Sequence, residues 1–258
     1  FFRRNIIMIS ISKKEPLIIL LDLDHTIQGN IQPQLDEYNL ISVLNDKTGS
    51  KLKQNRDQLR RDFMKGLLRP HFRTFINKMR SRFPNVEFFV YTASDDDWAK
   101  YIIKVVEEAS TIRFNKRIFS RSDCIFDQKS GHFMKSLNKL KPELFKILKS
   151  KYKLSDSNTL KHVLLIDNNY VLFENEAHSL VKCPSYTSTI RIDMLRSLPM
   201  SFVETHQEMI SMYILGYHEK NLHTLYKKVY DKSIHHDILH DNYWINELKR
   251  FKRNYKLT

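Results

Sequence analysis

Three short apolar runs, each followed by polar turn residues, stand out along the chain. They lie at 17–21, 86–91 and 162–166. Their lengths and their β-branched and aromatic residues are typical of buried β-strands. The pattern therefore predicts three buried strands that are well separated in the sequence.

Between these runs, apolar residues recur at the spacing that places them on one face of a helix. The recurrence predicts helices over 73–83, 98–109 and 142–152. Strands that alternate with helices are typical of an α/β fold with a parallel sheet. We therefore expect a Rossmann-like parallel sheet flanked by helices.

Two segments depart from this alternation. Residues 30–66 are largely polar and poorly periodic, so we expect an insertion after the first strand, either a cap loop over a site or a mobile solvated loop. Residues 201–258 are basic with periodic apolar positions, which predicts a helical extension that packs on the domain or on a partner. The main domain is expected at 16–200, and a segment at 1–15 leads into it.

The composition allows one substantial core, because 41% of the 258 residues are hydrophobic. A total of 43 lysines and arginines against 29 acidic residues gives a formal charge of +14, which favours an anionic partner such as nucleic acid, a phosphorylated peptide or a membrane surface. An AT-biased genome, which encodes lysine at many solvated positions, would produce the same excess, so charge alone does not choose among these partners. No run approaches the roughly 18 apolar residues that span a bilayer, so we expect no membrane-spanning segment.

Two features bear on the compartment. Cys124 and Cys183 match no disulfide framework or zinc pattern, which indicates a reducing, intracellular compartment. The brief apolar stretch after Arg3 and Arg4 leads almost directly into the first predicted strand, which is atypical of a signal peptide. Because the chain begins with Phe1, we expect that residues precede it in the natural protein.

Side chains that can do chemistry follow all three predicted strands, at the sheet edge where α/β proteins place their sites. They are Asp22 and Asp24, then Thr92 and Ser94, then Asp167 and Asn168. Two carboxylates at a strand tip are costly to bury unless a cation pairs with them or donors hydrogen-bond to them. The arrangement predicts a phosphoryl-transfer site with a nucleophilic aspartate, a proton-carrying aspartate and a divalent metal; a strand that runs into a solvated turn is the alternative.

The motifs around these residues resemble those of one family. In chain order they are Asp22-Leu23-Asp24-His25-Thr26, Leu68-Arg69-Pro70-His71-Phe72, Val90-Tyr91-Thr92-Ala93-Ser94, Phe133-Met134-Lys135-Ser136-Leu137 and Leu165-Ile166-Asp167-Asn168-Asn169. Over roughly 15–200 their order and spacing resemble the haloacid-dehalogenase-type phosphatases. Within that family they resemble the NLI-interacting-factor-like branch, which acts on the C-terminal domain of RNA polymerase II.

The resemblance implies a role for each matching residue. Asp22 would be the nucleophile that forms an aspartyl-phosphate, and Asp24 would protonate the leaving alkoxide and then activate water. The expected ligands of Mg²⁺ are Asp22, the backbone carbonyl of Asp24, Asp167 and Asn168. The residues expected to bind or neutralise the phosphoryl group are Thr26, Thr92, Arg121 and Lys135.

Other readings remain open at several of these positions. Lys139 and Lys141 are rivals of Lys135, and a plain salt bridge explains Arg121 nearly as well as phosphate binding does. The acidic run 95–97 favours helix capping over a metal cluster. Arg69 is expected to order the turn into the following helix.

The departures from the family pattern and the tail are less informative. The chain departs from the family pattern at Gln28-Gly29-Asn30, at Ser136 and at Asn169-Tyr170. None of these departures removes a catalytic group, but they leave the substrate in doubt. His236 and His240 would share a helix face, where a solvated role is favoured over transition-metal binding. The segments 243–244 and 249–253 suggest a basic-aromatic patch for nucleic acid or a partner.

The motif set predicts a Mg²⁺-dependent phosphatase of phosphoserine or phosphothreonine in an extended peptide, and the family resemblance implies an RNA polymerase tail as its substrate. The expected partners are a phosphoprotein and the transcription machinery, in the nucleus or cytoplasm. Two alternatives stay open. The basic surface favours a phosphatase of nucleic-acid ends, and the altered loops favour a catalytically silent binding module with the same fold.

Overall fold

The computed structural model describes residues 9–12, 14–29, 51–186, 200–205, 207–208, 220–221, 223–224 and 241–257. At the centre of this part of the chain lies a sheet of five strands in the spatial order β4-β3-β2-β7-β8. Their bounds are Leu17–Leu21 (β2), Val86–Tyr91 (β3), Ile118–Phe119 (β4), His162–Asp167 (β7) and Leu180–Lys182 (β8). Every neighbouring pair is parallel, which confirms the predicted parallel sheet.

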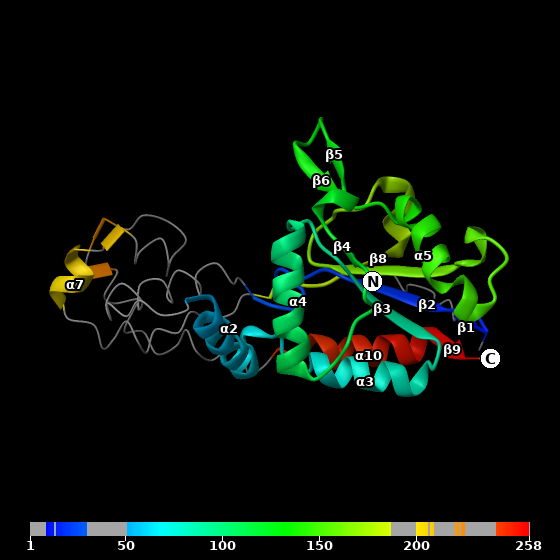
Figure 1. The fold of residues 1–258 in the computed structure, drawn as a ribbon, viewed down its shortest axis with the longest axis horizontal. Helices are drawn as coiled ribbons and strands as arrows, with labels where there is room; N and C mark the ends of the chain where they lie inside the picture. The colour runs from blue at the N-terminus through cyan, green and yellow to red at the C-terminus, as the bar shows by residue number, and fades with distance from the viewer. Residues whose placement is uncertain are drawn as a thin grey trace, which may run out of the picture.

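Helices cover both faces of the sheet (Figure 1). The bounds of the helices in the two layers are Phe72–Arg82 (α3), Asp96–Ser110 (α4) and Tyr243–Asn254 (α10) on one face, and Leu137–Tyr152 (α5) on the other. Leu17, Ile19 and Leu21 belong to the first core, whereas Ile18 and Leu20 belong to the core under α5. Successive side chains of β2 therefore serve opposite layers, which is why the strand is apolar throughout.

Smaller elements surround this core. The ends of the described chain meet where β1 (Ile9–Ile11) pairs in parallel with β9 (Tyr255–Leu257). An antiparallel hairpin of β5 (Ile125–Asp127) and β6 (His132–Met134) projects from the body (Figure 1). The remaining short helical elements are η2 (Arg121–Asp123), η3 (Ser157–Thr159), η4 (Glu174–Ser179) and α7 (Met200–Thr205). None of the helices in the described ranges is long and apolar enough to cross a membrane.

The structure describes only the end of the insertion expected at 30–66. It contains α2 (Lys51–Asp62), followed by a wider turn of helix, η1 (Phe63–Leu67). Leu59 is fully buried in the core that α4 also borders. Residues 30–50, on which the expectation of a cap loop mostly depends, lie outside the described residues.

The aromatic residues at the start of α10 are part of the core. Trp244 is fully buried, and its ring centroid lies 5.1 Å from that of Phe72 and 4.8 Å from that of Phe75. The predicted basic-aromatic patch is therefore wrong at Trp244, whose ring packs against α3 and presents no stacking face to a nucleic acid. Tyr243 is half-buried, and its ring centroid lies 4.9 Å from that of Trp244. His236 and His240 lie outside the described residues.

Arg69 is 1% exposed and joins three parts of the chain. Its Nε and Nη2 donate to the carboxylate of Asp241 at 3.1 and 2.9 Å, and its Nη1 donates to the backbone oxygen of Pro184 at 2.9 Å. The guanidinium carbon lies 5.4 and 4.4 Å from the ring centroids of Tyr186 and Tyr243. Arg69 thus anchors the entry to α10, a wider role than the turn ordering expected from its place before Pro70.

We expect Asp241→Asn to lower the free energy of unfolding by about 2 kcal/mol, because it removes the charge opposite a buried guanidinium. Urea unfolding followed by circular dichroism measures the change. Asp57→Asn is the matched control, because the Asp57 side chain is 53% exposed and lies 4.0 Å from Arg60. We expect it to cost less than about 0.5 kcal/mol. Equal costs in the two variants would contradict the anchoring role of Asp241.

Candidate functional site

Asp22 follows β2 directly, at the carboxyl edge of the sheet between β3 and β7. The residue is only 7% exposed. Its Oδ1 accepts a 2.7 Å hydrogen bond from Lys135 Nζ, and its Oδ2 accepts one of 3.2 Å from Thr26 Oγ1. Both carboxylate oxygens are therefore held by donors, which fixes the orientation of the side chain at the strand tip.

Lys135 supplies the cation that paired carboxylates at a strand tip require. Its Nζ lies 2.7 Å from Asp22 Oδ1 and 2.7 Å from Asp167 Oδ2, and its side chain is 1% exposed. The backbone N–H of Lys135 donates to Val171 at 2.8 Å, which holds the residue beside the end of β7. The rival Lys139 instead donates to the backbone oxygen of Cys124 at 3.0 Å, outside this cluster.

The electrostatics of this cluster follow from burial and close charges. Burial opposes the ammonium of Lys135, but Asp22 and Asp167 outweigh it, so that the pKa of Lys135 is raised above its ordinary value. Burial raises the pKa of Asp22 to about 7; Lys135 opposes this shift, whereas Asp167 and Asp24 add to it. Lys135 therefore keeps its positive charge and shares it between carboxylates that come from two strands.

Thr26 is fully buried and joins the ends of β2 and β7. Its hydroxyl lies 3.2 Å from both Asp22 Oδ2 and Asn168 Oδ1, and it accepts a 3.1 Å bond from the backbone N–H of Asn168. A hydroxyl has one proton, so it donates to one of these oxygens at a time. A residue that binds phosphate would point its hydroxyl to open space. Thr26 instead uses its hydroxyl to orient its neighbours.

Asp24 has surroundings unlike those of Asp22. Its Oδ1 accepts a 3.1 Å bond from Gln28 Nε2, and its Oδ2 accepts a 2.9 Å bond from Ser94 Oγ. The residue is partly exposed, so solvent reaches its carboxyl group. Two carboxylates in different environments are the usual basis for separate nucleophilic and acid–base roles.

Asp167 is the last residue of β7, on the other side of Asp22 from β3, and Asn168 follows it. Asp167 is 1% exposed, and its Oδ1 accepts a 2.7 Å bond from the backbone N–H of Asn169. Asn168 is 7% exposed and donates through Nδ2 to Ser185 Oγ at 3.0 Å. The parallel sheet thus brings residues from positions 22 and 167 to the same edge, as the predicted strands imply.

Thr92 follows β3 and is 1% exposed. Its backbone N–H donates to Phe119 at 3.0 Å, and its Oγ1 accepts a 3.2 Å bond from the backbone N–H of Ser94. The backbone N–H is therefore occupied by β4. The hydroxyl is therefore the group of Thr92 that remains able to contact a phosphoryl oxygen, as expected for this residue.

The acidic run 95–97 begins α4, and its first member is the helix cap. Asp95 accepts a 2.9 Å hydrogen bond from the backbone N–H of Trp98. Asp96 accepts hydrogen bonds from the hydroxyls of Ser120 and Ser122, which lower the pKa of Asp96. The preference for capping over a metal cluster is confirmed.

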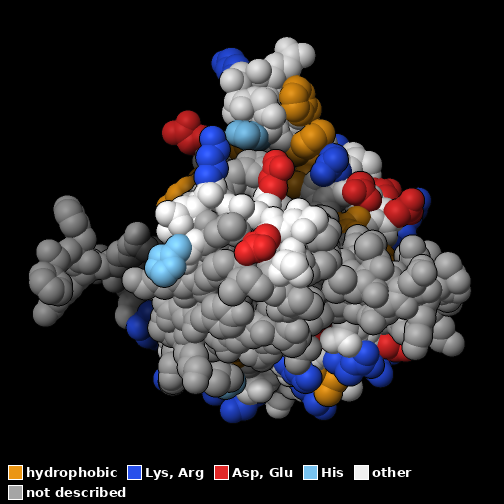
Figure 2. All heavy atoms as spheres, turned by 90° about the vertical axis from the view of Figure 1, so that its left-hand side faces the viewer, with side chains coloured by type: hydrophobic (Ala, Val, Ile, Leu, Met, Phe, Trp, Pro, Cys, Tyr) orange, Lys and Arg blue, Asp and Glu red, His pale blue; other side chains and the backbone are white. Residues whose placement is uncertain are grey.

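An exposed apolar surface and a cation border the site, just before Lys135 in the chain. Ile125, Phe126 and Phe133 of the β5–β6 hairpin are 38, 54 and 37% exposed. The guanidinium carbon of Arg121 lies 5.4 Å from the ring centroid of Phe133, and Arg121 Nε donates to Ala93 at 2.8 Å. Among the described residues no carboxylate pairs with Arg121, whose contacts are the backbone oxygen of Ala93 and the Phe133 ring. Figure 2 shows hydrophobic side chains at the surface of this upper part of the molecule.

The donors expected to hold Mg²⁺ meet in part. The carboxylates of Asp22 and Asp167 converge on Lys135, whereas the carboxylate of Asp24 turns toward Ser94. The described residues accordingly contain no group of three or more His, Cys, Asp or Glu side chains placed to bind a metal. The expected set does not need one, because Asp24 contributes its backbone carbonyl and Asn168 its amide. All four are hard oxygen donors, so the donor chemistry fits Mg²⁺.

Sequence reasoning did not find the segment 183–186, which lies beside the site. The backbone N–H of Cys183 donates to the backbone oxygen of Asp167 at 2.9 Å, and that of Tyr186 donates to the backbone oxygen of His25 at 2.7 Å. His25 has a left-handed backbone (φ 59°) at the turn between Asp24 and Thr26. Backbone groups make most of these contacts, so no residue type signals them in the sequence.

Comparison with known proteins gives a family and several similar folds. The family model of the NLI interacting factor-like phosphatases matches residues 17–214. No curated protein sequence matches the chain. Similar solved structures include Fcp1, an essential RNA polymerase II CTD phosphatase (18% identity, TM-score 0.48), and a fission yeast Fcp1 variant bound to beryllium fluoride (19%, 0.49).

The extent of these structural matches differs. In the two Fcp1 matches, 93% of this chain covers 62% of the other, so the chain spans less than two thirds of their length. The HAD domain of effector protein Lem4 from Legionella pneumophila is matched over 76% of this chain and 98% of that one, at 12% identity and a TM-score of 0.33.

Proposed function

This chain belongs to the NLI interacting factor-like phosphatases, and on that premise we propose that it is a Mg²⁺-dependent phosphatase of phosphoserine or phosphothreonine in an extended peptide. The proposed substrate class includes a tail of the RNA polymerase II type, with the transcription machinery as partner in the nucleus or cytoplasm. The observation that carries the proposal is the buried bridge from Asp22 through Lys135 to Asp167. Three buried charges cost several kcal/mol to desolvate, which a purely structural module has no reason to keep.

In the proposed reaction, an oxygen of Asp22 attacks the phosphorus of the substrate. The bond from phosphorus to the serine or threonine oxygen breaks, and Asp24 gives its proton to that oxygen. In the second step, Asp24 takes a proton from water, whose oxygen attacks the phosphorus and releases inorganic phosphate from Asp22. Lys135 offsets the negative charge of the phosphoryl oxygens throughout.

The other site residues position these groups. Thr26 orients the Asp22 carboxylate through its hydroxyl, and the Thr92 hydroxyl and Arg121 are proposed to contact phosphoryl oxygens. Mg²⁺, held by Asp22, the Asp24 carbonyl, Asp167 and Asn168, would supply positive charge that stabilises the transferring group. We also propose that the chain divides into a main domain at 16–200 and an extension at 201–258.

The test compares substrates side by side in the presence of Mg²⁺. We expect wild-type protein to hydrolyse a serine or threonine phosphopeptide and to turn over a 5′-phosphorylated oligonucleotide at least about tenfold more slowly in kcat/KM. EDTA should abolish turnover, and added Mg²⁺ should restore it. Preference for the oligonucleotide would favour a nucleic-acid-end phosphatase, and turnover of no phosphate ester would favour the binding module.

The β5–β6 hairpin is proposed to contact the peptide that flanks the phosphate. We expect Phe126→Ala to raise KM for a phosphopeptide about fivefold, because it removes an apolar contact worth about 1 kcal/mol. Turnover of p-nitrophenyl phosphate, which has no peptide, should not change. Met64→Ala is the matched control, because Met64 is 70% exposed and lies in η1. The hairpin contact is ruled out if KM for the peptide stays at the wild-type value.

A further inference from the structure

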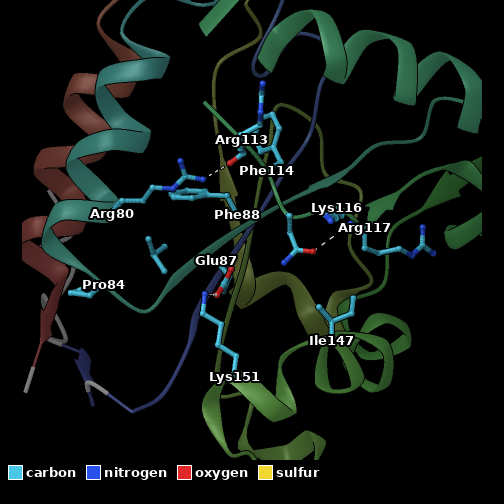
Figure 3. A pocket seen from close by; sticks show the side chains of 12 residues that line it. Arg80, Pro84, Glu87, Phe88, Arg113, Phe114, Lys116, Arg117, Ile147 and Lys151 are labelled. Carbon is cyan, nitrogen blue, oxygen red and sulfur yellow. Dashed lines mark hydrogen bonds and ion pairs between the residues drawn. The ribbon is translucent and has the colours of Figure 1, made fainter. Parts of the chain in front are cut away.

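A cavity of about 830 Å³ opens beside the first half of β3, away from the carboxyl edge of the sheet (Figure 3). Phe88 and Phe114 contribute apolar surface to it. The basic side chains that line it are Arg80, Arg113, Lys116, Arg117 and Lys151. Glu87 is the only acidic residue of the lining, so the cavity combines an apolar wall with a positively charged rim.

The basic residues of this rim differ in whether a carboxylate neutralises their charge. Three of them pair with carboxylates: Lys151 with Glu87, Arg117 with Asp123 and Glu143, and Arg113 with Glu107. In the described part of the chain, no carboxylate pairs with Arg80 or Lys116. Arg80 donates to the backbone oxygen of Arg113 and lies over the Phe88 ring, 5.7 Å from its centroid. Two positive charges at the rim are therefore available to an anion from outside.

We propose that this cavity is a second docking site for the phosphorylated peptide, where Arg80 and Lys116 bind a phosphate other than the one hydrolysed at Asp22. The proposal rests on the proposed function and deepens it. It makes the preferred substrate a chain with at least two phosphates.

The position of the cavity on the sheet sets the spacing of those phosphates. Lys116 precedes β4, whose Phe119 accepts the backbone N–H of Thr92. Phe88 lies four residues before Thr92 along β3, roughly 13 Å at the rise of a strand. An extended peptide covers that distance in about four to six residues. This offset sets a lower bound: two phosphates of one chain must be at least about four residues apart to reach Asp22 and the rim together, and simultaneous binding would raise the apparent affinity.

The surroundings favour a peptide over a nucleic acid. Single-stranded nucleic acids bind on exposed aromatic faces, whereas Phe88 and Phe114 are only 2 and 8% exposed. The paired carboxylates Glu87, Glu107, Asp123 and Glu143 also interrupt the basic surface. A continuous phosphate backbone would meet them, but a peptide with separate phosphates need not.

The test uses two synthetic peptides, one with a single phosphoserine and one with a second phosphoserine five residues away. We expect KM of the wild type to be about tenfold lower for the second peptide. Lys116→Glu should remove this advantage while leaving turnover of p-nitrophenyl phosphate unchanged. Lys104→Glu is the control, because Lys104 is exposed on α4 and the charge change is the same. The double variant Arg80→Gln/Lys116→Gln repeats the test without introducing an acid.

Direct binding separates this proposal from the proposed function. Fluorescence anisotropy with a labelled doubly phosphorylated peptide needs no turnover, so Lys116-dependent binding by a protein that hydrolyses nothing would retain the docking site and reject the enzyme. Equal KM values for the two peptides in the wild type would overturn the docking site. So would an advantage that survives in both rim variants, or a single-stranded oligonucleotide that binds as tightly as the doubly phosphorylated peptide.

Discussion

Replacing Asp22 with asparagine should abolish phosphate-ester hydrolysis, with kcat at least about 1,000-fold below wild type. An amide oxygen is a far weaker nucleophile than a carboxylate oxygen, so the aspartyl-phosphate cannot form. Asparagine fills the same space: its Oδ1 can still accept from Lys135, which now donates to Asp22 Oδ1, and its Nδ2 can donate to the Thr26 hydroxyl, which now donates to Asp22 Oδ2. Steady-state hydrolysis of p-nitrophenyl phosphate with Mg²⁺ measures the loss.

Asp95→Asn is the matched control for this substitution. Asp95 lies near the same edge of the sheet and caps α4 through Trp98, a role that asparagine fills about as well. We expect its kcat to stay within about twofold of the wild type, since capping is preserved. Hydrolysis by Asp22→Asn at a tenth of the wild-type rate or faster would contradict the nucleophilic role of Asp22.

Replacing Lys135 with methionine should lower the free energy of unfolding by about 3–5 kcal/mol and also remove activity. The lysine is 1% exposed and lies 2.7 Å from each of two carboxylates. Methionine keeps most of the volume, but it leaves Asp22 and Asp167 buried side by side without their cation. Urea unfolding measures the stability, and kcat is measured on protein that circular dichroism shows to be folded.

Lys139→Met separates the charge bridge from the general loss of a lysine. Lys139 is exposed, and its Nζ donates to the backbone oxygen of Cys124 at 3.0 Å. We expect this variant to lose less than about 1 kcal/mol and to keep its activity. If Lys135→Met were as stable and active as Lys139→Met, the bridge would have neither the structural nor the catalytic importance that we assign to it.

The sequence predicted the strands that are buried on both faces and missed those at the margins. β2 and β3 have the predicted bounds, because an apolar run is the direct consequence of burial between two layers. β4 and β8 have two and three residues, too few for a pattern to appear. The pairing of β1 with β9 joins positions more than 240 residues apart, and neither strand carries a local sign of its partner.

The tail likewise has a part that the sequence predicted and a part that it did not. The periodic apolar positions of the tail indicated a helix that packs on something, but not which surface covers it. In the structure Trp244 packs against Phe72 and Phe75, because the Arg69–Asp241 pair brings α10 alongside α3. The expectation of a basic-aromatic patch failed at Trp244 because amphipathic spacing is the same for a helix that docks on its own domain and for one that docks on a partner.

The sequence by itself determined the chemistry available to this protein: which strands end in which side chains, and that their motifs resemble a phosphatase family. Only the tertiary structure decided how those side chains share charge and hydrogen bonds. It placed Lys135 between Asp22 and Asp167, turned Asp24 toward Ser94 and occupied the Thr92 backbone N–H with Phe119. The physical reason is that residue types and strand ends follow from local patterns of burial. Contacts between positions 22, 135 and 167 exist only once the sheet has assembled, because bonds a few ångströms long join segments that are more than 30 residues apart in the chain.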